Sequence, residues 1–217
     1  MAEPESLPPE FQPVSLTDPL PTFKAWLEEA EQCTALFHPL YMCLSTASND
    51  GQPHSRPVCL GPVSENGIEF ITWDFYNKVR ELEQNPRVSA CVNWEPLYKF
   101  IRVEGEAERL SPAEVSSMFQ GLGLRMQCSL ICSASADQEV KSRAEVHQEF
   151  LELLQTYEPK GEKVPTPKEM IGYRIAPTMY EFYNGHPDLA TLIHACDRVV
   201  FTRESSKGKW CVKRVTI

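Results

Sequence analysis

The feature that most constrains the fold is a series of short apolar segments separated by turn signals. Asn49-Asp50-Gly51 and Glu65-Asn66-Gly67 are sequences typical of tight turns, and each lies between two runs with strand character. Segments of this length joined by such turns form antiparallel meanders. The strands predicted in this half of the chain cover residues 40–48, 55–63, 68–73, 87–94 and 99–110.

Helices are predicted around this meander. Residues 18–33 begin with an aspartate that can cap a helix and continue with apolar residues at helical spacing, and residues 76–84 form a shorter helix that ends at a proline. Ser111-Pro112-Ala113-Glu114 combines a capping box with proline in the first helical position, so a third helix begins there. The longest predicted helix lies within residues 136–157.

The last third of the chain returns to strands after a linker at 158–167, and the predicted strands are 172–176, 180–183, 198–203 and 209–215. No alternation of strand and helix typical of parallel sheets is present. We therefore predict an α+β fold built on an antiparallel barrel with peripheral helices. Residues 1–18 contain four prolines and four acidic residues, which predicts a disordered or loosely draped arm before a single domain over 19–217.

Composition narrows the class of function. The 217 residues include 21 Lys plus Arg and 30 Asp plus Glu, for a net charge of −9. Nucleic acids and anionic membranes require a basic face, so neither is an expected partner. No apolar run approaches the ~20 residues that span a bilayer, and the amino terminus lacks the pattern of a signal peptide. A cytoplasmic protein is therefore expected.

The eight cysteines are scattered without a CxxC pair, and several lie in apolar runs. They are interpreted as small buried hydrophobic residues rather than disulfides. A zinc site formed by Cys128, Cys132, His194 and Cys196 is conceivable, but the spacing matches no common ligand pattern, so no metal is predicted. Phosphate-binding loops, dinucleotide fingerprints and hydrolase signatures are absent from the sequence.

The informative signal is a set of short motifs in a fixed order and spacing. The motifs are Arg56-Pro-Val-Cys-Leu60, Phe70-Ile-Thr72, Asn77-Lys78, Glu181-Phe-Tyr-Asn-Gly185 and Asp197-Arg198. In this register the chain resembles the pyridoxamine 5'-phosphate oxidase family from about residue 20 to its end. The resemblance implies an FMN-binding split β-barrel, a homodimer with the cofactor at the subunit interface, and a small phosphorylated or vitamin B6-like substrate.

The resemblance also implies which residues bind the cofactor. A phosphate dianion needs fixed cations, and the basic residues at the matching positions suit it. The cofactor-binding residues implied in this way are Arg56, Val58, Thr72, Lys78, Tyr183 and Arg198. The chain departs from the family at two further cofactor positions, where Asn77 replaces an arginine and Phe100 replaces a glutamine.

The implied substrate site departs further. Three side chains that grip the substrate phosphate in the family correspond here to Gly61, Met118 and Leu122. The family's Arg-Leu-His-Asp-Arg motif reads His194-Ala-Cys-Asp-Arg198, and His194 is the candidate for proton transfer. Because three charged or polar contacts are missing, pyridoxine and pyridoxamine 5'-phosphate are expected to be poor substrates.

Two functions remain open from the sequence. The first is an FMN-dependent oxidoreductase related to pyridoxal 5'-phosphate formation, with an altered substrate pocket. The second is a catalytically inactive relative that binds flavin or acts as a dimeric interaction protein. Large aromatic residues near the inferred site, namely Trp73, Phe75, Trp94 and Phe100, are expected to supply apolar surface to the dimer.

Overall fold

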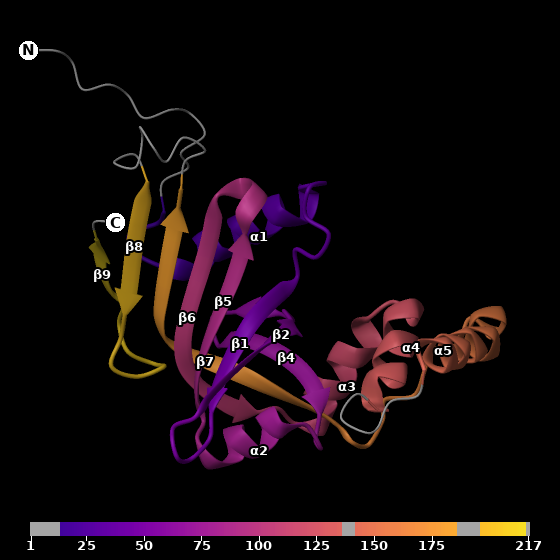
Figure 1. Ribbon diagram of the computed structural model, residues 1–217. Coiled ribbons are helices and arrows are strands. Elements are labelled where there is room, and N and C mark those ends of the chain that lie inside the picture. The colour runs from indigo at the N-terminus through magenta and orange to yellow at the C-terminus, as the bar shows by residue number, and fades with distance from the viewer. Residues whose placement is uncertain (1–13, 136–141, 186–195, 216–217) are drawn as a thin grey trace, which may run out of the picture.

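The computed structural model describes residues 14–135, 142–185 and 196–215 (Figure 1). In this part of the chain five α-helices surround one antiparallel sheet of nine strands, which confirms the predicted α+β class. The elements are α1 (Pro19–Gln32), β1 (Tyr41–Ala47), β2 (Pro53–Cys59), β3 (Val63–Ser64), β4 (Gly67–Trp73), α2 (Asn77–Gln84), β5 (Arg87–Trp94), β6 (Lys99–Arg109), α3 (Pro112–Gly121), α4 (Leu124–Cys132), α5 (Arg143–Tyr157), β7 (Met170–Asn184), β8 (Asp197–Thr202) and β9 (Cys211–Arg214).

The long strand β7 organises the sheet. The order along the main path is β2-β1-β5-β6-β7-β4-β3, and β8 and β9 extend from β7 as a branch. On the edge opposite β6, residues 170–175 of β7 pair with β4, whereas residues 179–184 pair with β8. The sheet therefore forks at the middle of β7, and the strongly curved strands around this fork are visible in Figure 1.

The prediction of two separate strands over 172–176 and 180–183 was wrong, because β7 is continuous. The separating residue, Pro177, has no N–H to donate, yet it lies at a register shift between β6 and β7, next to Gly105. A Cβ on Gly105 would lie 2.2 Å from the carbonyl oxygen of Ala176. Glycine in β6 therefore permits the close backbone approach that lets a proline remain inside the strand.

The helices largely follow their predicted signals. α1 begins after Asp18, whose side chain accepts from the N–H of Leu20, and α3 and α5 each begin with a complete capping box. The longest predicted helix starts later than expected, at Arg143, while residues 136–141 lie outside the described residues. Helix α4 was not predicted, because it is short and directly follows the Gly121–Gly123 segment.

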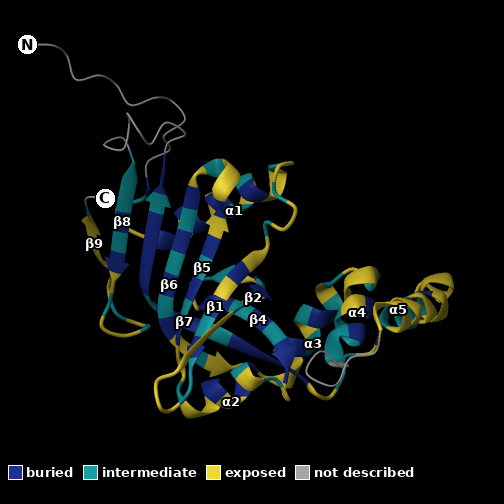
Figure 2. Cartoon of the chain, viewed as in Figure 1, coloured by how far each residue is buried: buried dark blue, intermediate teal, exposed yellow. Residues whose placement is uncertain are grey.

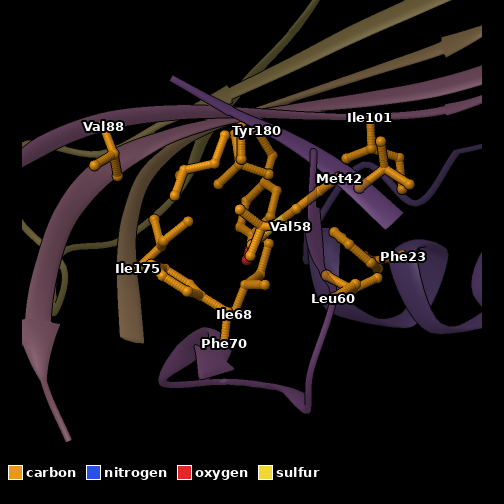
Figure 3. Close-up of a cluster of buried hydrophobic side chains, with 14 of the residues drawn as sticks. Phe23, Met42, Val58, Leu60, Ile68, Phe70, Val88, Ile101, Ile175 and Tyr180 are labelled. Carbon is orange, nitrogen blue, oxygen red and sulfur yellow. The ribbon is translucent and has the colours of Figure 1, made fainter. Parts of the chain in front are cut away.

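Most of the buried side chains form one cluster on the inner face of the sheet. Figure 3 shows Phe23 of α1 together with Val58, Phe70 and Tyr180 from three different strands. Alternate residues of β1, β5 and β6 are buried, as expected for strands with one face on the core. A second cluster lies between α3, α4 and α5, although α5 itself is mostly exposed (Figure 2).

The end of the predicted arm belongs to the packed domain. Val14 is buried in the main core, and the N–H of Ser15 donates to the hydroxyl oxygen of Thr22 at 2.9 Å. Residues 14–18 therefore anchor the start of α1, whereas residues 1–13 lie outside the described residues. Within the described part of the chain, no helix is both long and apolar enough to cross a membrane.

The expectations for cysteines and aromatic residues hold only in part. Cys128 and Cys132 are buried as predicted, but Cys43 is exposed at an outward-facing position of β1, and Cys211 is exposed because the whole of β9 is exposed.

Among the aromatic residues expected at a dimer surface, Trp73 and Trp94 are buried within the chain, while Phe75 is exposed and Phe100 half-buried. The two tryptophans stabilise the core instead.

Candidate functional site

A cavity of about 800 Å³ opens between the end of β2, strand β4 and helices α3 and α4. Its walls are mainly apolar, and three of the predicted cofactor residues, Val58, Thr72 and Lys78, line it. Cavities of this size and character typically bind small molecules. The fold creates it because α3 and α4 lie beside the end of β4 rather than over the centre of the sheet (Figure 1).

Lys78 lies in the first turn of α2, at the side of this cavity. Its Nζ donates to the hydroxyl oxygen of Thr72 at 3.1 Å and lies 4.1 Å from the centre of the Tyr76 ring. The positive end of the α2 dipole adds to the charge of Lys78 at this point. Asn77, which replaces the expected arginine, is exposed and accepts from Arg80 at 2.5 Å.

Arg56 is held against α2 one turn further along the helix, at Glu81. Its guanidinium donates to the hydroxyl of Thr46 at 2.5 Å and to Oε2 of Glu81 at 3.3 Å. Glu81 also accepts from Thr46 and pairs with Nδ1 of His54 at 2.8 Å. Arg56 is therefore fixed in direction by a carboxylate whose side chain is only 10% exposed, and it does not line the cavity itself.

Glu81 was not identified from the sequence. It lies three residues after Lys78, beside Leu82 on the buried stripe of α2. Acidic residues are rarely buried unless they are paired, so a glutamate on this stripe was the signal in the sequence. Val58 is placed differently from the polar candidates. It packs in the main core near Leu60 and Phe70 and offers the cavity only an apolar wall (Figure 3).

Tyr183 and Arg198 form a second group. They are direct register partners on β7 and β8, and the Tyr183 ring stacks on Phe100 with centroids 4.5 Å apart and planes 7° from parallel. Burial and a hydrogen bond with Cys196 raise the pKa of Tyr183 to about 12, so its hydroxyl remains protonated at neutral pH.

Arg198 belongs to a charged network on the same face. Its Nε donates to Glu181 at 2.6 Å, and Arg102 donates to the other oxygen of that carboxylate. The Glu181 side chain is only 4% exposed. Burial opposes its charged form, yet the hydrogen bonds from Arg198 and Arg102 outweigh this effect and hold the pKa of Glu181 below its ordinary value.

The strand registers place the two groups on opposite faces of the sheet. Arg56 and Val58 pair with Leu44 and Met42, whose side chains face the core. Cys43 lies between Met42 and Leu44 and therefore faces the other, outer side of the sheet; it pairs with Cys91, which pairs with Arg102. The same outer face carries Asn93, Phe100, Tyr183 and Arg198, which pair in this order across β5, β6, β7 and β8. Tyr183 and Arg198 accordingly do not line the cavity.

The positions that correspond to a phosphate grip all line the cavity. Met118 and Leu122 come from α3 and its end, and Gly61 follows β2. A Cβ on Gly61 would lie 2.7 Å from Cε of Met118 and 2.6 Å from the carbonyl oxygen of Glu69. The three positions that the resemblance groups together thus line one cavity, and Gly61 and Met118 are direct neighbours.

The remaining candidate, His194, lies outside the described residues, so its proton-transfer role stays a prediction. Cys196 is half-buried beside β8. Among the residues that the structure describes, no three His, Cys, Asp or Glu side chains lie close enough together to hold a metal ion.

Comparison with known proteins relates this arrangement to one family. Residues 28–156 match the sequence model described as pyridoxamine 5'-phosphate oxidase. The pyridoxine-5'-phosphate oxidase of Bos taurus is 34% identical over 198 residues, which cover 90% of this chain and 73% of the bovine protein. The pyridoxine/pyridoxamine 5'-phosphate oxidase of Salinibacter ruber is 32% identical over 198 residues, or 91% and 88% of the two chains.

Solved structures show the same fold. PhzG from Burkholderia lata, in complex with tetrahydrophenazine-1-carboxylic acid, has a TM-score of 0.75 and 25% identity, and the match covers 98% of both chains. A pyridoxamine 5'-phosphate oxidase-related, FMN binding protein from Nostoc punctiforme has a TM-score of 0.68 at 14% identity, covering 92% of this chain and 98% of that one. With the sequence matches, these findings show that the chain belongs to the pyridoxamine 5'-phosphate oxidase family.

Proposed function

We propose that the protein is an FMN-dependent oxidoreductase of this family, acting as a cytoplasmic homodimer with a flavin bound between the two subunits. One observation carries the proposal: the six implied cofactor residues divide into two groups on opposite faces of one sheet. A flavin cannot contact both groups of the same chain. It can contact the cavity-side group of one copy and the outer-face group of another, which a two-fold dimer provides twice.

The cavity-side group suits the phosphate end of FMN. Lys78 lies in the first turn of α2, Arg56 contacts the next turn through Glu81, Thr72 provides a hydroxyl, and the N-terminal end of the helix favours an anion. Arg56 keeps N–H groups beyond those that bond Leu44, Thr46 and Glu81, since a guanidinium has five. These residues would hold the phosphate, while the loss of the arginine at position 77 leaves fewer cations than the family pattern implies.

The remaining residues would position the ring. When bound, FMN supplies the acceptor for a hydride from the substrate and passes the electrons to oxygen. Val58 and Trp73 contribute apolar walls against which the ring would pack. From the second copy, Tyr183 offers a flat protonated phenol already stacked on Phe100, and Arg198 offers a cation beside it.

The test is FMN binding to the purified protein, followed by flavin fluorescence and by light scattering on the same sample. We expect a dimer that retains FMN after desalting. Arg56→Ala should weaken binding by more than tenfold, because removing one partner of a charge-assisted contact costs about 1.5 to 3 kcal/mol. Arg80→Ala is the matched control, since Arg80 is an exposed cation of the same helix, and should change binding less than twofold.

Three results would contradict the proposal. A monomer at micromolar concentration would remove the composite site. A wild-type dimer that binds no FMN would leave the non-catalytic interaction protein as the function. Equal losses in Arg56→Ala and Arg80→Ala would mean that net charge, rather than the position of Arg56, determines binding.

A further inference from the structure

The cavity has two ends with different chemistry. At one end, Thr72 and Lys78 provide polar groups for a cofactor phosphate. The other end is formed by Gly61, Met118 and Leu122, surrounded by further apolar side chains. If FMN occupies the first end, as proposed above, the second end is left for the substrate.

No cation reaches the second end from the described lining residues. The charged side chains among them are Lys78, which is bonded to Thr72, and two carboxylates, Glu69 and Glu114. Both carboxylates pair with Arg174, at 2.6 and 2.8 Å, and Arg174 itself is not in the lining. The two carboxylates therefore share the single positive charge of Arg174, and the one Lys or Arg of the described lining, Lys78, is already bonded to Thr72.

The carboxylate of Glu114 remains ionised at every physiological pH. Hydrogen bonds from Ser111, the cap of α3, and from Arg174 lower the pKa of Glu114 to about 2. A phosphate dianion placed near Gly61 would meet the thioether of Met118 and the net negative group of Glu69, Glu114 and Arg174, and no cation from the described lining of the same chain would reach it. Such a group would lose its hydration without compensation.

The backbone also prevents a lysine from occupying the position of Gly61. The N–H of Gly61 donates to the carbonyl oxygen of Glu69 at 2.9 Å, so the chain after β2 lies directly against β4. Any Cβ at this position would lie 2.6 Å from that oxygen, a separation that side chains do not tolerate. A lysine at position 61 would therefore require the backbone of β4 to move, and exchanging the side chain alone would not restore the cation.

From these contacts we infer that the second end of the cavity binds an uncharged aromatic ring compound that carries no phosphate. The apolar walls bury the faces of the ring, and the thioethers of Met118 and Met126 suit contact with an aromatic edge. A volume of about 800 Å³ lies within the range of pockets for such ligands. This inference rests on the proposed function, because it gives the other end of the cavity to FMN.

The test is equilibrium dialysis of FMN-loaded protein under anaerobic conditions with three probes: 2-naphthalenemethanol, pyridoxine and pyridoxine 5'-phosphate. We expect naphthalenemethanol to bind most tightly and the phosphate ester to bind no better than pyridoxine. A pocket with charged phosphate contacts would instead favour the phosphate ester by at least tenfold. That preference in the wild type, or no binding of naphthalenemethanol up to its solubility limit, would overturn the inference.

Leu122→Arg provides the complementary gain of function, since it adds a cation at the end of α3 inside the cavity. It should raise the affinity for pyridoxine 5'-phosphate by more than tenfold and lower that for naphthalenemethanol. Ala113→Arg adds the same charge to an exposed position of α3 outside the lining and should change neither. If Leu122→Arg and Ala113→Arg changed the two affinities equally, net charge rather than the cavity lining would determine binding, and the inference would be contradicted.

Flavin retention is recorded separately in every sample. If the protein fails to hold FMN yet binds naphthalenemethanol, the oxidoreductase proposal fails while the ligand class stands. If FMN is retained and the phosphate ester binds more tightly than pyridoxine, the ligand class fails while the oxidoreductase proposal stands.

Discussion

The two faces of the central sheet hold their functional residues by different means. On the cavity side, Arg56 is directed by hydrogen bonds to Thr46 and Glu81, and Lys78, which borders the mainly apolar cavity, is directed by Thr72. On the outer face, Arg198 is part of a closed network with Glu181 and Arg102, and Tyr183 already has a stacking partner. The first arrangement is open to a ligand, whereas the second is a preformed surface. This difference fits the proposal that each face supplies half of a site.

The largest expected effect on the outer face follows from Glu181→Gln. This variant removes the buried carboxylate that accepts from two guanidinium groups, so the free energy of unfolding should fall by about 1 to 3 kcal/mol at pH 7. Glu104→Gln is the control, because Glu104 is more exposed and contacts only the Arg102 side of the network. It should cost less than about 0.5 kcal/mol.

The pH dependence sharpens this prediction. The folded-state pKa of Glu181 is lowered, so its contribution is complete above the ordinary pKa of about 4.3 and is lost as the pH falls through the folded value. Urea unfolding of wild type and Glu181→Gln should therefore differ at pH 7 and converge at acidic pH. A gap that is independent of pH, or equal in the Glu104→Gln variant, would show that packing rather than charge holds this face.

A smaller effect is expected at the aromatic stack of the outer face. Phe100→Leu removes the parallel contact with Tyr183, and an aromatic pair contributes about 0.5 to 1.5 kcal/mol beyond its buried area. A double-mutant cycle with Tyr183→Leu should give a coupling energy in this range by urea unfolding. Phe37→Leu, at a side chain that is 95% exposed, is the control and should leave stability unchanged. A coupling energy near zero would mean that the stack does not fix Tyr183.

Local patterns in the sequence were sufficient for much of this fold. Turn signals and alternating apolar residues define β1, β2, β4, β5 and β6, and Ser111 with its paired glutamate marks a helix start, whereas the short strand β3 was not predicted as a separate element. The continuity of β7 could not be predicted in this way. It depends on Gly105, a residue of another strand that accommodates Pro177.

The site was predictable to a similar extent. The family register implied Arg56 and Lys78 as cofactor residues, and it grouped Gly61, Met118 and Leu122, which the structure places around one cavity. It did not identify Glu81 as the partner of Arg56, because that contact joins α2 to β2 across the fold. The shape of the cavity was equally inaccessible, since at least five segments distant in the sequence form its walls.

The central claim is that one flavin is bound by the cavity side of one subunit and the outer face of the other. Its most direct test mixes Arg56→Ala protein with Tyr183→Ala/Arg198→Ala protein, after light scattering has shown that each variant is still a dimer. Each variant alone should bind FMN weakly, because both of its sites lack one half. After subunit exchange, each mixed dimer should contain one intact site, so about a quarter of all sites should bind FMN as tightly as the wild type. Failure to recover any tight site, with exchange verified by tagged subunits, would contradict the account.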